Sequence, residues 1–353
     1  MQTRDRIAQS SVPATLGVIG DGWTLSLLTA LVGNTLRFEE LMKVLTIPRS
    51  TLSTRLRHLI DHGLIAPHPY CERPLRFEYA LSERGAALLP VLALADAFDV
   101  EHGGQPATLR HAPSHGAPHP LRAVACCAAC GAAVEARHVV ARYAPLPGPR
   151  AAPVTTPKQK RVSRSRSARK PLWRARDVLE DAWAAHVVAA LFMGAQRFTE
   201  LLDATQAAPN IVSERLQRLA DARLLRHVTA AEREREREHD AADHDAAGHG
   251  AAGQDTAGHS AAGHSASERR AAPSVYRLNA RGLALYPLVV ALIAYGDEGR
   301  RVPSLTLTHR CGAPLRLRLS CAGCTDLEYG VPLLPSSVSF AMQVDLCATP
   351  TPT

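Results

Sequence analysis

The stretch that decides the fold is residues 37–62, which read RFEELMKVLTIPRSTLSTRLRHLIDH. Its apolar side chains recur every three or four residues in two separate runs, as they do along one face of a helix. The first run is Phe38, Leu41 and Leu45, and the second is Leu52, Leu56, Leu59 and Ile60. Pro48 separates the two runs, and Gly63 favours a helix stop after the second. The pattern predicts two helices joined by a short turn, which is a helix-turn-helix.

The residues that follow predict a β-hairpin and a further helix. Residues 64–66 and 77–81 are short apolar runs typical of strands, and the Pro- and Arg-containing segment between them suits an exposed hairpin. Ser82 is a good N-cap for a helix whose apolar positions begin at Leu88. A hairpin placed after a helix-turn-helix is a wing. Residues 1–104 are therefore predicted to form a winged helix-turn-helix domain.

The chain repeats this pattern. Placing each residue against the one 160 positions later aligns Trp23 with Trp183, and no gap is needed up to residue 64. The match resumes at an offset of 197, where Tyr79 meets Tyr276, so the second copy carries 37 additional residues before its last strand. A repeat of this kind predicts two domains of the same fold in tandem.

Composition changes mark the parts of the chain between and after these domains. Nine Lys and Arg lie from residue 158 to 176, in the linker and just after it, and this segment is either a solvated spacer or a basic strap that lies along phosphates. The predicted parts are a winged helix-turn-helix domain (1–104), a Cys/His appendix (105–144), a basic Pro/Ser-rich linker (145–172), a second, degenerate winged helix domain (173–300) with a disordered His-rich insertion (230–272), a second Cys/His appendix (301–335) and a tail (336–353).

Overall composition restricts the class of protein. Lys and Arg (41) exceed Asp and Glu (33) by 8, which favours an anionic partner. No run of about 18 unbroken apolar residues is present, and the first residues lack the apolar core of a secretory signal. We therefore expect a cytoplasmic protein without a membrane partner, associated with the nucleoid. The eight Cys are too few for a disulfide scaffold, and six of them lie in two clusters, a pattern that favours metal ligation.

Residues 10 to 98 resemble the HxlR family of bacterial winged-helix transcription regulators. The resemblance rests on the segment around Trp23, R-F-x-E-L at 37–41, L-x-x-R-L at 52–56 and R-P-x-R-x-E-Y at 73–79. The second copy keeps related segments but has lost the wing motif to its insertion. The resemblance implies sequence-specific binding of double-stranded DNA, usually by a homodimer that places two recognition helices in successive major grooves. Two copies in one chain allow either a homodimer or an intramolecular pseudo-dimer that reads an asymmetric site.

The candidate DNA-binding residues lie on the second predicted helix and on the wing. Hydroxyl and guanidinium groups are the types that read base edges and bind phosphates. The candidates are Arg49, Ser50, Thr51, Thr54, Arg55, Arg57 and His58 on the helix, and Arg73 and Arg76 on the wing. In the second copy Glu214 replaces Thr54 and Gln217 replaces Arg57, so we expect that copy to bind DNA more weakly.

A Cys-x-x-Cys pair follows each copy, in similar Gly-Ala-Pro surroundings. Two thiolates from such a turn, with His or Cys from a neighbouring hairpin, complete a tetrahedral zinc site. The candidate ligands are His309, Cys311, Cys321 and Cys324 after the second copy, and His111, His115, Cys127 and Cys130 after the first. The alternatives are reduced thiols or a redox disulfide. We therefore predict an α+β fold, mainly α, with tandem winged helix-turn-helix domains. Each domain is followed by a small appendix, which would resemble a zinc ribbon.

These features favour a transcriptional regulator, which we expect to be a repressor that occupies a promoter. The alternative is a metal-responsive or protein-interaction scaffold whose degenerate winged helices no longer bind specific DNA. An enzyme is not expected, because the sequence has no Gly-rich phosphate loop, nucleophile elbow or paired acid and base. The sequence names neither a small-molecule effector nor a target promoter.

Overall fold

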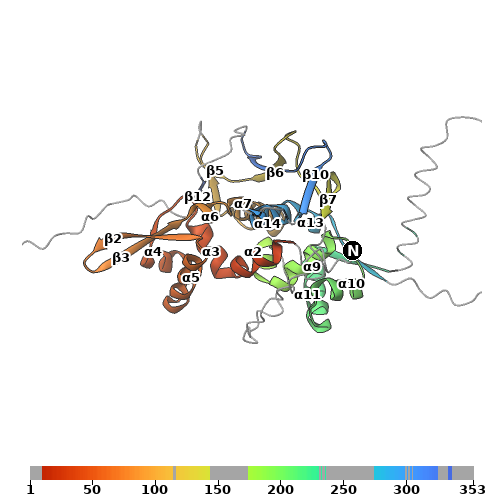
Figure 1. The fold of residues 1–353 in the computed structure, drawn as a ribbon, viewed down its shortest axis with the longest axis horizontal. Helices are drawn as coiled ribbons and strands as arrows, with labels where there is room; N and C mark the ends of the chain where they lie inside the picture. The colour runs from red at the N-terminus through yellow and green to blue at the C-terminus, as the bar shows by residue number, and fades with distance from the viewer. Residues whose placement is uncertain are drawn as a thin grey trace, which may run out of the picture.

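The computed structural model describes residues 10–113, 117–143, 174–229, 232, 235, 274–298, 300, 303, 305–324 and 333–335. Figure 1 shows these residues in three tiers, with short strands at the top, long helices in the middle and two helix-turn-helix segments below. The elements of the first half are α2 (Val12–Ile19), α3 (Gly22–Ala30), β1 (Leu36–Arg37), α4 (Phe38–Leu45), α5 (Arg49–Asp61), β2 (Ile65–Glu72), β3 (Leu75–Leu81), α6 (Glu83–Ala86) and α7 (Leu89–Gly103).

Helices α4 and α5 form the predicted helix-turn-helix, which is thereby confirmed. The carboxylate of Glu40 accepts a hydrogen bond from the backbone N–H of Arg37 at 2.7 Å and so satisfies one of the free donors at the start of α4. Thr46, with a left-handed φ of 51°, ends that helix. The apolar stripe predicted on α5 is its buried face, since its three leucines are at most 3% exposed. They are Leu52, Leu56 and Leu59.

The wing is longer than the sequence predicts. Strands β2 and β3 pair along most of their length, with an irregularity between Pro69 and Cys71, and β1 adds a third strand beside β3. The apolar runs at 64–66 and 77–81 mark only the base of this hairpin, where it contacts the core. Beyond it the pairing rests on backbone hydrogen bonds, which do not require apolar side chains.

Apart from β1, which has no counterpart among the described strands, the second half repeats the order of elements of the first. Its elements are α8 (Ala175–Glu180), α9 (Ala182–Phe192), α10 (Phe198–Thr205), α11 (Pro209–Asp221), β8 (Leu225–Val228), β9 (Val275–Leu278), α13 (Ala280–Leu283) and α14 (Tyr286–Asp297). Local details recur as well. Asp21 and Asp181 each cap a helix by accepting a backbone hydrogen bond three residues on, at 3.2 and 3.1 Å. Gly85 and Gly282 each lie against the backbone of the turn after α5 or α11.

The two halves share one hydrophobic core across the central helices. Helix α14 packs against α7 and α2, and α7 also packs against α8. The carboxylate of Asp99 in α7 accepts a hydrogen bond from the backbone N–H of Ala175 at 2.5 Å, and burial raises the pKa of Asp99 to about 6. By length and composition alone the segment Ala280–Asp297 is apolar enough to cross a membrane, with 44% of it buried in the protein. The packing of α14 accounts for that apolar sequence.

The strands after each half pair with those of the other half. They are β4 (Leu109–His111), β5 (His119–Pro120), β6 (Ala123–Cys127) and β7 (Val139–Tyr143) after α7, and β10 (Leu305–His309), β11 (Leu317–Cys321) and β12 (Leu333–Pro335) after α14. Strand β6 pairs with β11, β7 with β10 and β4 with β12, all antiparallel. The two predicted appendices therefore share their strands.

Three of the predicted parts lie outside the described residues. They are the linker at 145–172, the tail at 336–353 and, apart from Glu232 and Arg235, the His-rich insertion at 230–272.

Candidate functional site

The exposed face of α5 carries four of the nine predicted DNA-binding residues. Arg49, Ser50, Thr54 and Arg57 are exposed, and Thr51 beside them is half-buried. Ser53, which the sequence reasoning missed, is exposed on the same face, between the buried leucines of the stripe. The hydroxyls of Ser53 and Thr54 donate to backbone carbonyls one turn earlier, at 3.0 and 2.9 Å. The oxygen atoms of these hydroxyls remain on the surface as acceptors.

Two predicted contacts instead hold α5 in place. The guanidinium Nε of Arg55 lies 3.3 Å from a carboxylate oxygen of Asp21, and only 20% of the Arg55 side chain is exposed. His58 Nε2 lies 3.0 Å from the backbone carbonyl of Val18. Both side chains thus reach back to the helices behind α5. The helical projection could not show this, because it places residues on a face without saying what lies beside them.

The remaining predicted cations are on the surface. Arg73 and Arg76 are both exposed near the tip of the wing. Arg49 forms a surface ion pair with Glu39 at 2.8 Å, which is easily exchanged for a phosphate because both side chains are more than 60% exposed. Arg37, which was not predicted, has its guanidinium over the ring of Tyr70 in β2, 4.2 Å from the ring centre.

Helix α11 has the same pattern of burial as α5 but different surface chemistry. Its exposed positions carry Asn210, Ser213, Glu214 and Gln217. The two arginines of α11, Arg215 and Arg218, both bind the carboxylate of Asp181, at 3.1 and 2.6 Å. The exposed face of α11 therefore presents a carboxylate and no guanidinium where α5 presents Arg57, which lowers its attraction for phosphate.

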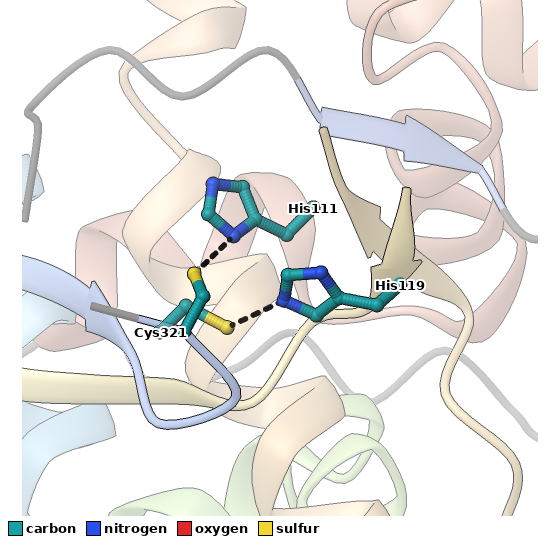
Figure 2. Close-up of side chains that lie close together, drawn as sticks. His111, His119 and Cys321 are labelled. Atoms are coloured by element: carbon teal, nitrogen blue, oxygen red, sulfur yellow. Dashed lines mark hydrogen bonds between the residues drawn. The ribbon is translucent and has the colours of Figure 1, made fainter. Parts of the chain in front are cut away.

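The first of two metal-ligand groups consists of His111, His119, Cys321 and Cys324. His119 Nε2 lies 3.4 Å from Cys321 Sγ, and His111 Nδ1 lies 3.2 Å from Cys324 Sγ. Figure 2 shows the two imidazoles on neighbouring strands, pointing toward the cysteine turn of the other half. The four ligand atoms all lie within 4.8 Å of one another, and His111 is 1% exposed.

The second group consists of Cys127, Cys130, His309 and Cys311. His309 Nδ1 lies 3.4 Å from Cys130 Sγ and 3.3 Å from Cys311 Sγ, and the thiols of Cys127 and Cys311 are 4.0 Å apart. A zinc ion with Zn–S of about 2.3 Å and Zn–N of about 2.0 Å holds its tetrahedral ligand atoms roughly 3.3–3.8 Å apart. Both groups have ligand types and separations that fit a tetrahedral metal ion.

The protein surroundings favour a thiolate at the first cysteine of each turn. Burial acts to raise the pKa of Cys127, but backbone N–H groups of Cys130 and Ala129 hold it below the ordinary value. Burial likewise opposes ionisation of Cys321, whose pKa is lowered by the backbone N–H of Arg122 and by His119. Since the thiolate is the form of cysteine that binds metal ions, these surroundings favour metal binding at each turn.

The structure groups the predicted metal ligands into two sites in a different way from the sequence prediction. The sequence placed one site after each copy, whereas each group takes its Cys-x-x-Cys from one half and its other two ligands from the other half. His115 lies outside the described residues, and His119, which was not predicted, belongs to the first group. The sequence does contain a signal for His119 as a ligand, because it is the second histidine after His111 and stands at the start of a short apolar run.

Comparison with known proteins agrees with the helix-turn-helix geometry. A model of the HxlR-like helix-turn-helix matches residues 18–104. An uncharacterized HTH-type transcriptional regulator of Mycobacterium bovis, Mb3122, is 36% identical over 150 residues, which are 41% of this chain and 89% of that protein. The chain belongs to the HxlR-like helix-turn-helix family. The resemblance inferred from the motifs of residues 10 to 98 is thereby confirmed.

A further curated relative and a solved structure are similar to part of the chain. An uncharacterized HTH-type transcriptional regulator of Bacillus subtilis, YdzF, is 32% identical over 106 residues, which are 30% of this chain and 97% of that protein. The solved structure of the redox regulator HypR in its reduced form is 28% identical, covers 27% of this chain and 94% of that chain, and has a TM-score of 0.26. The curated relatives are named as transcriptional regulators and not as enzymes, as the sequence predicts.

Proposed function

We propose that this HxlR-like protein is a transcriptional repressor that occupies its promoter by placing α5 in the major groove. The observation that carries the proposal is the exposed face of α5, where Arg49, Ser50, Thr54 and Arg57 stand on a helix-turn-helix. Arginine forms two hydrogen bonds to guanine in the major groove, and serine and threonine hydroxyls form hydrogen bonds with the edges of several bases. The exposed Arg73 and Arg76 would then reach the adjacent backbone or minor groove. Such a role belongs in the cytoplasm, with the nucleoid.

We also propose that the second half is a second winged helix and that the chain acts as an intramolecular pseudo-dimer. The support is the recurrence of element order, helix caps and burial pattern between the halves. In Figure 1 α5 and α11 both lie along the lower edge of the molecule, away from the shared strands. Two recognition helices on one side suit two successive major grooves. A homodimer of the whole chain would instead carry four such helices. Sedimentation at the concentrations used for DNA binding distinguishes the single chain from the homodimer.

The first test compares equivalent positions on the two recognition helices. Arg57→Ala is expected to weaken specific DNA binding by roughly 5- to 150-fold, about 1–3 kcal/mol, because it removes a base- or phosphate-binding guanidinium. Gln217→Ala is expected to change affinity less than about threefold, because its amide already binds Asp221 at 2.8 Å and carries no charge. Fluorescence anisotropy on a promoter fragment found by genome-wide mapping gives both affinities at one salt concentration.

The control for charge is Arg142→Ala, which removes an exposed cation from β7, far from α5 along the chain. It is expected to leave specific affinity within about twofold, because β7 lies on the other side of the central helices from α5 in Figure 1 and salt screens exposed charges. An equal loss for Gln217→Ala and Arg57→Ala would refute the unequal roles of the two helices.

A scaffold without specific DNA binding is the second candidate, and the acidic exposed position Glu214 on α11 is the observation that favours it. DNA binding that falls steeply with salt but does not depend on sequence would support the scaffold. A discrete footprint would support the regulator.

We propose zinc as the ion for the two His/Cys groups, in a structural role. Imidazole nitrogens and thiolates are the ligands of closed tetrahedral zinc sites, and the described groups contain no carboxylate. Protein purified under reducing conditions is expected to contain two zinc ions per chain by elemental analysis. Protein that stays metal-free when it is refolded with excess zinc would refute the assignment and leave reduced thiols or a disulfide as the state of these cysteines.

A further inference from the structure

The two metal-ligand groups lie at opposite ends of one two-stranded ribbon. Strands β6 and β11 run antiparallel, with Cys127 opposite Leu317 and Ala123 opposite Cys321. Each Cys-x-x-Cys turn begins at the last residue of its own strand, at Cys127 or at Cys321. The ribbon therefore carries the cysteine turn of the first half at one end and that of the second half at the other.

Each turn meets its remaining ligands across the boundary between the halves. His119 and Cys321, whose Nε2 and Sγ atoms are 3.4 Å apart, are separated by 202 residues of chain. Cys130 and His309, whose Sγ and Nδ1 atoms are also 3.4 Å apart, are separated by 179 residues. An ion at either site would bond to two residues of each half.

The ligands are attached closely to the central helices. His111 ends β4, which follows α7, and His309 ends β10, which follows α14. Helices α7 and α14 pack against each other, and α14 also packs against α2. Figure 1 shows the shared strands on one side of these helices and the recognition helices on the other. A change in how α7 and α14 meet would therefore move α5 relative to α11.

The strands alone provide little to hold the halves together on this side. The β6–β11 and β7–β10 ribbons are two-stranded, with five residue pairs each, and β4 and β12 add only three pairs. Two-stranded ribbons of this kind are marginally stable in water, and small domains of this size usually depend on metals or disulfides for stability. The seven cysteines among the described residues form no disulfide.

We propose that the two zinc ions act as cross-links between the halves of the chain, so that metal occupancy fixes the relative position of α5 and α11. This inference rests on the proposed zinc sites and on the proposed DNA-binding role. It makes specific DNA affinity depend on zinc although no ligand of the ion lies on the DNA-binding face. The apo protein keeps its two helix-turn-helix segments folded but holds them in a looser mutual arrangement.

The first experiment removes and restores zinc in the full-length wild-type chain. Zinc is stripped with a chelator under reducing conditions, its loss is verified by elemental analysis, and affinity for the promoter fragment is measured before and after zinc is added back. We expect a reversible loss of about 5- to 150-fold, the usual range for coupling between sites. Hydrogen exchange should speed up in β6, β11, α7 and α14, while the buried stripe of α5 stays protected.

The second experiment uses a matched set of Cys→Ser variants. Cys127→Ser disables one group and Cys321→Ser the other, and each is expected to lose one zinc ion and to weaken DNA binding. Cys126→Ser is the control, because Cys126 neighbours Cys127 and is 8% exposed, but its thiol lies 3.3 Å from the Ser320 hydroxyl and in neither group. It should keep both zinc ions and wild-type affinity. If the other two variants fail to fold, the chelation of wild-type protein decides the matter.

The outcomes separate the inference from the proposals beneath it. Complete loss of zinc with unchanged affinity and unchanged exchange would overturn the cross-link and leave both zinc and DNA binding intact. A protein that holds no zinc would overturn the cross-link together with the zinc assignment. If zinc-loaded protein binds no specific DNA, the proposed repressor fails, and faster exchange in α7 and α14 on zinc removal would still support the cross-link.

Discussion

Replacing Gly85 or Gly282 by alanine is expected to lower the free energy of unfolding by about 3 kcal/mol, the upper end of typical overpacking costs. A Cβ atom at Gly85 would lie 2.0 Å from the backbone oxygen of Leu64, and one at Gly282 would lie 1.9 Å from that of Leu224. Both obstacles are main-chain atoms that cannot rotate aside. The loss should appear in calorimetry as a fall in Tm of about 10 °C.

An alanine at Gly85 would have to push two backbone segments apart, because no side-chain rotation relieves the clash with Leu64. The backbone N–H of Ser82 donates to the Leu64 carbonyl at 3.0 Å, and the Ser82 hydroxyl caps the helix by accepting from the N–H of Gly85, also at 3.0 Å. Pushing the two segments apart would weaken both bonds as well as the packing of the recognition helix on the wing. Asn279 performs the same capping role for Gly282, so the two variants should behave alike.

Gly17→Ala is the matched control. Gly17 lies inside α2, and a Cβ there would meet nothing within 4 Å, so alanine should stabilise the protein by about 0.5–1 kcal/mol. If Gly85→Ala were as stable as Gly17→Ala, the tight contact behind α5 would not exist. If only Gly282→Ala were tolerated, the second half would lack the architecture of the first.

The second large effect is expected for Asp181→Ala, which should destabilise the protein by about 3 kcal/mol, because it removes a helix cap together with charge-assisted hydrogen bonds. Asp181 accepts from the backbone N–H of Ala184 and binds both Arg215 and Arg218. All three charged side chains are less than 20% exposed. Its removal takes a shared carboxylate away from both guanidinium groups, while Arg215 keeps its ion pair with Glu214 at 2.8 Å. Thermal and urea unfolding followed by circular dichroism would measure the loss.

Asp21→Ala is the comparison within the same chain. Asp21 caps α3 in the same manner but binds only Arg55 across to the recognition helix, at 3.3 Å, and 30% of its side chain is exposed. The expected loss is about 1–2 kcal/mol, mainly the cap. Asp181→Asn should recover part of the stability, because asparagine still caps a helix. A larger loss for Asp21→Ala than for Asp181→Ala would contradict this account.

The sequence predicted those parts of the structure that depend on neighbours along the chain. The stripe at Leu52, Leu56 and Leu59 is a property of helical spacing, and the structure buries it. Arg55 shows where such reasoning ends. Its place at the edge of the stripe is local information, whereas its pairing with Asp21 depends on how α3 crosses α5. The same holds for Arg215 and Arg218, whose pairing with Asp181 depends on how α11 packs against α9.

The division of the metal ligands could not be predicted from spacing. Each Cys-x-x-Cys turn has a histidine partner nearby in the sequence and another about 200 residues away, and both pairings satisfy zinc equally well. Only the antiparallel pairing of β6 with β11, a long-range contact, selects the distant partner. His119 was missed for the same reason, because its role appears only when β5 is placed beside the turn at Cys321.

The pairing of β6 with β11 also has a consequence during synthesis on the ribosome. The side chains of Cys126 and Ser320 meet diagonally across the ribbon but are 194 residues apart in the chain. At about 5–20 residues per second, β6 waits roughly 10–40 s for its partner to be translated. During that interval the first winged helix can fold, while the thiol of Cys127, which is fully buried in the finished protein, is open to thiol-reactive compounds in the cell. The nascent chain is therefore more vulnerable to thiol damage than the finished protein.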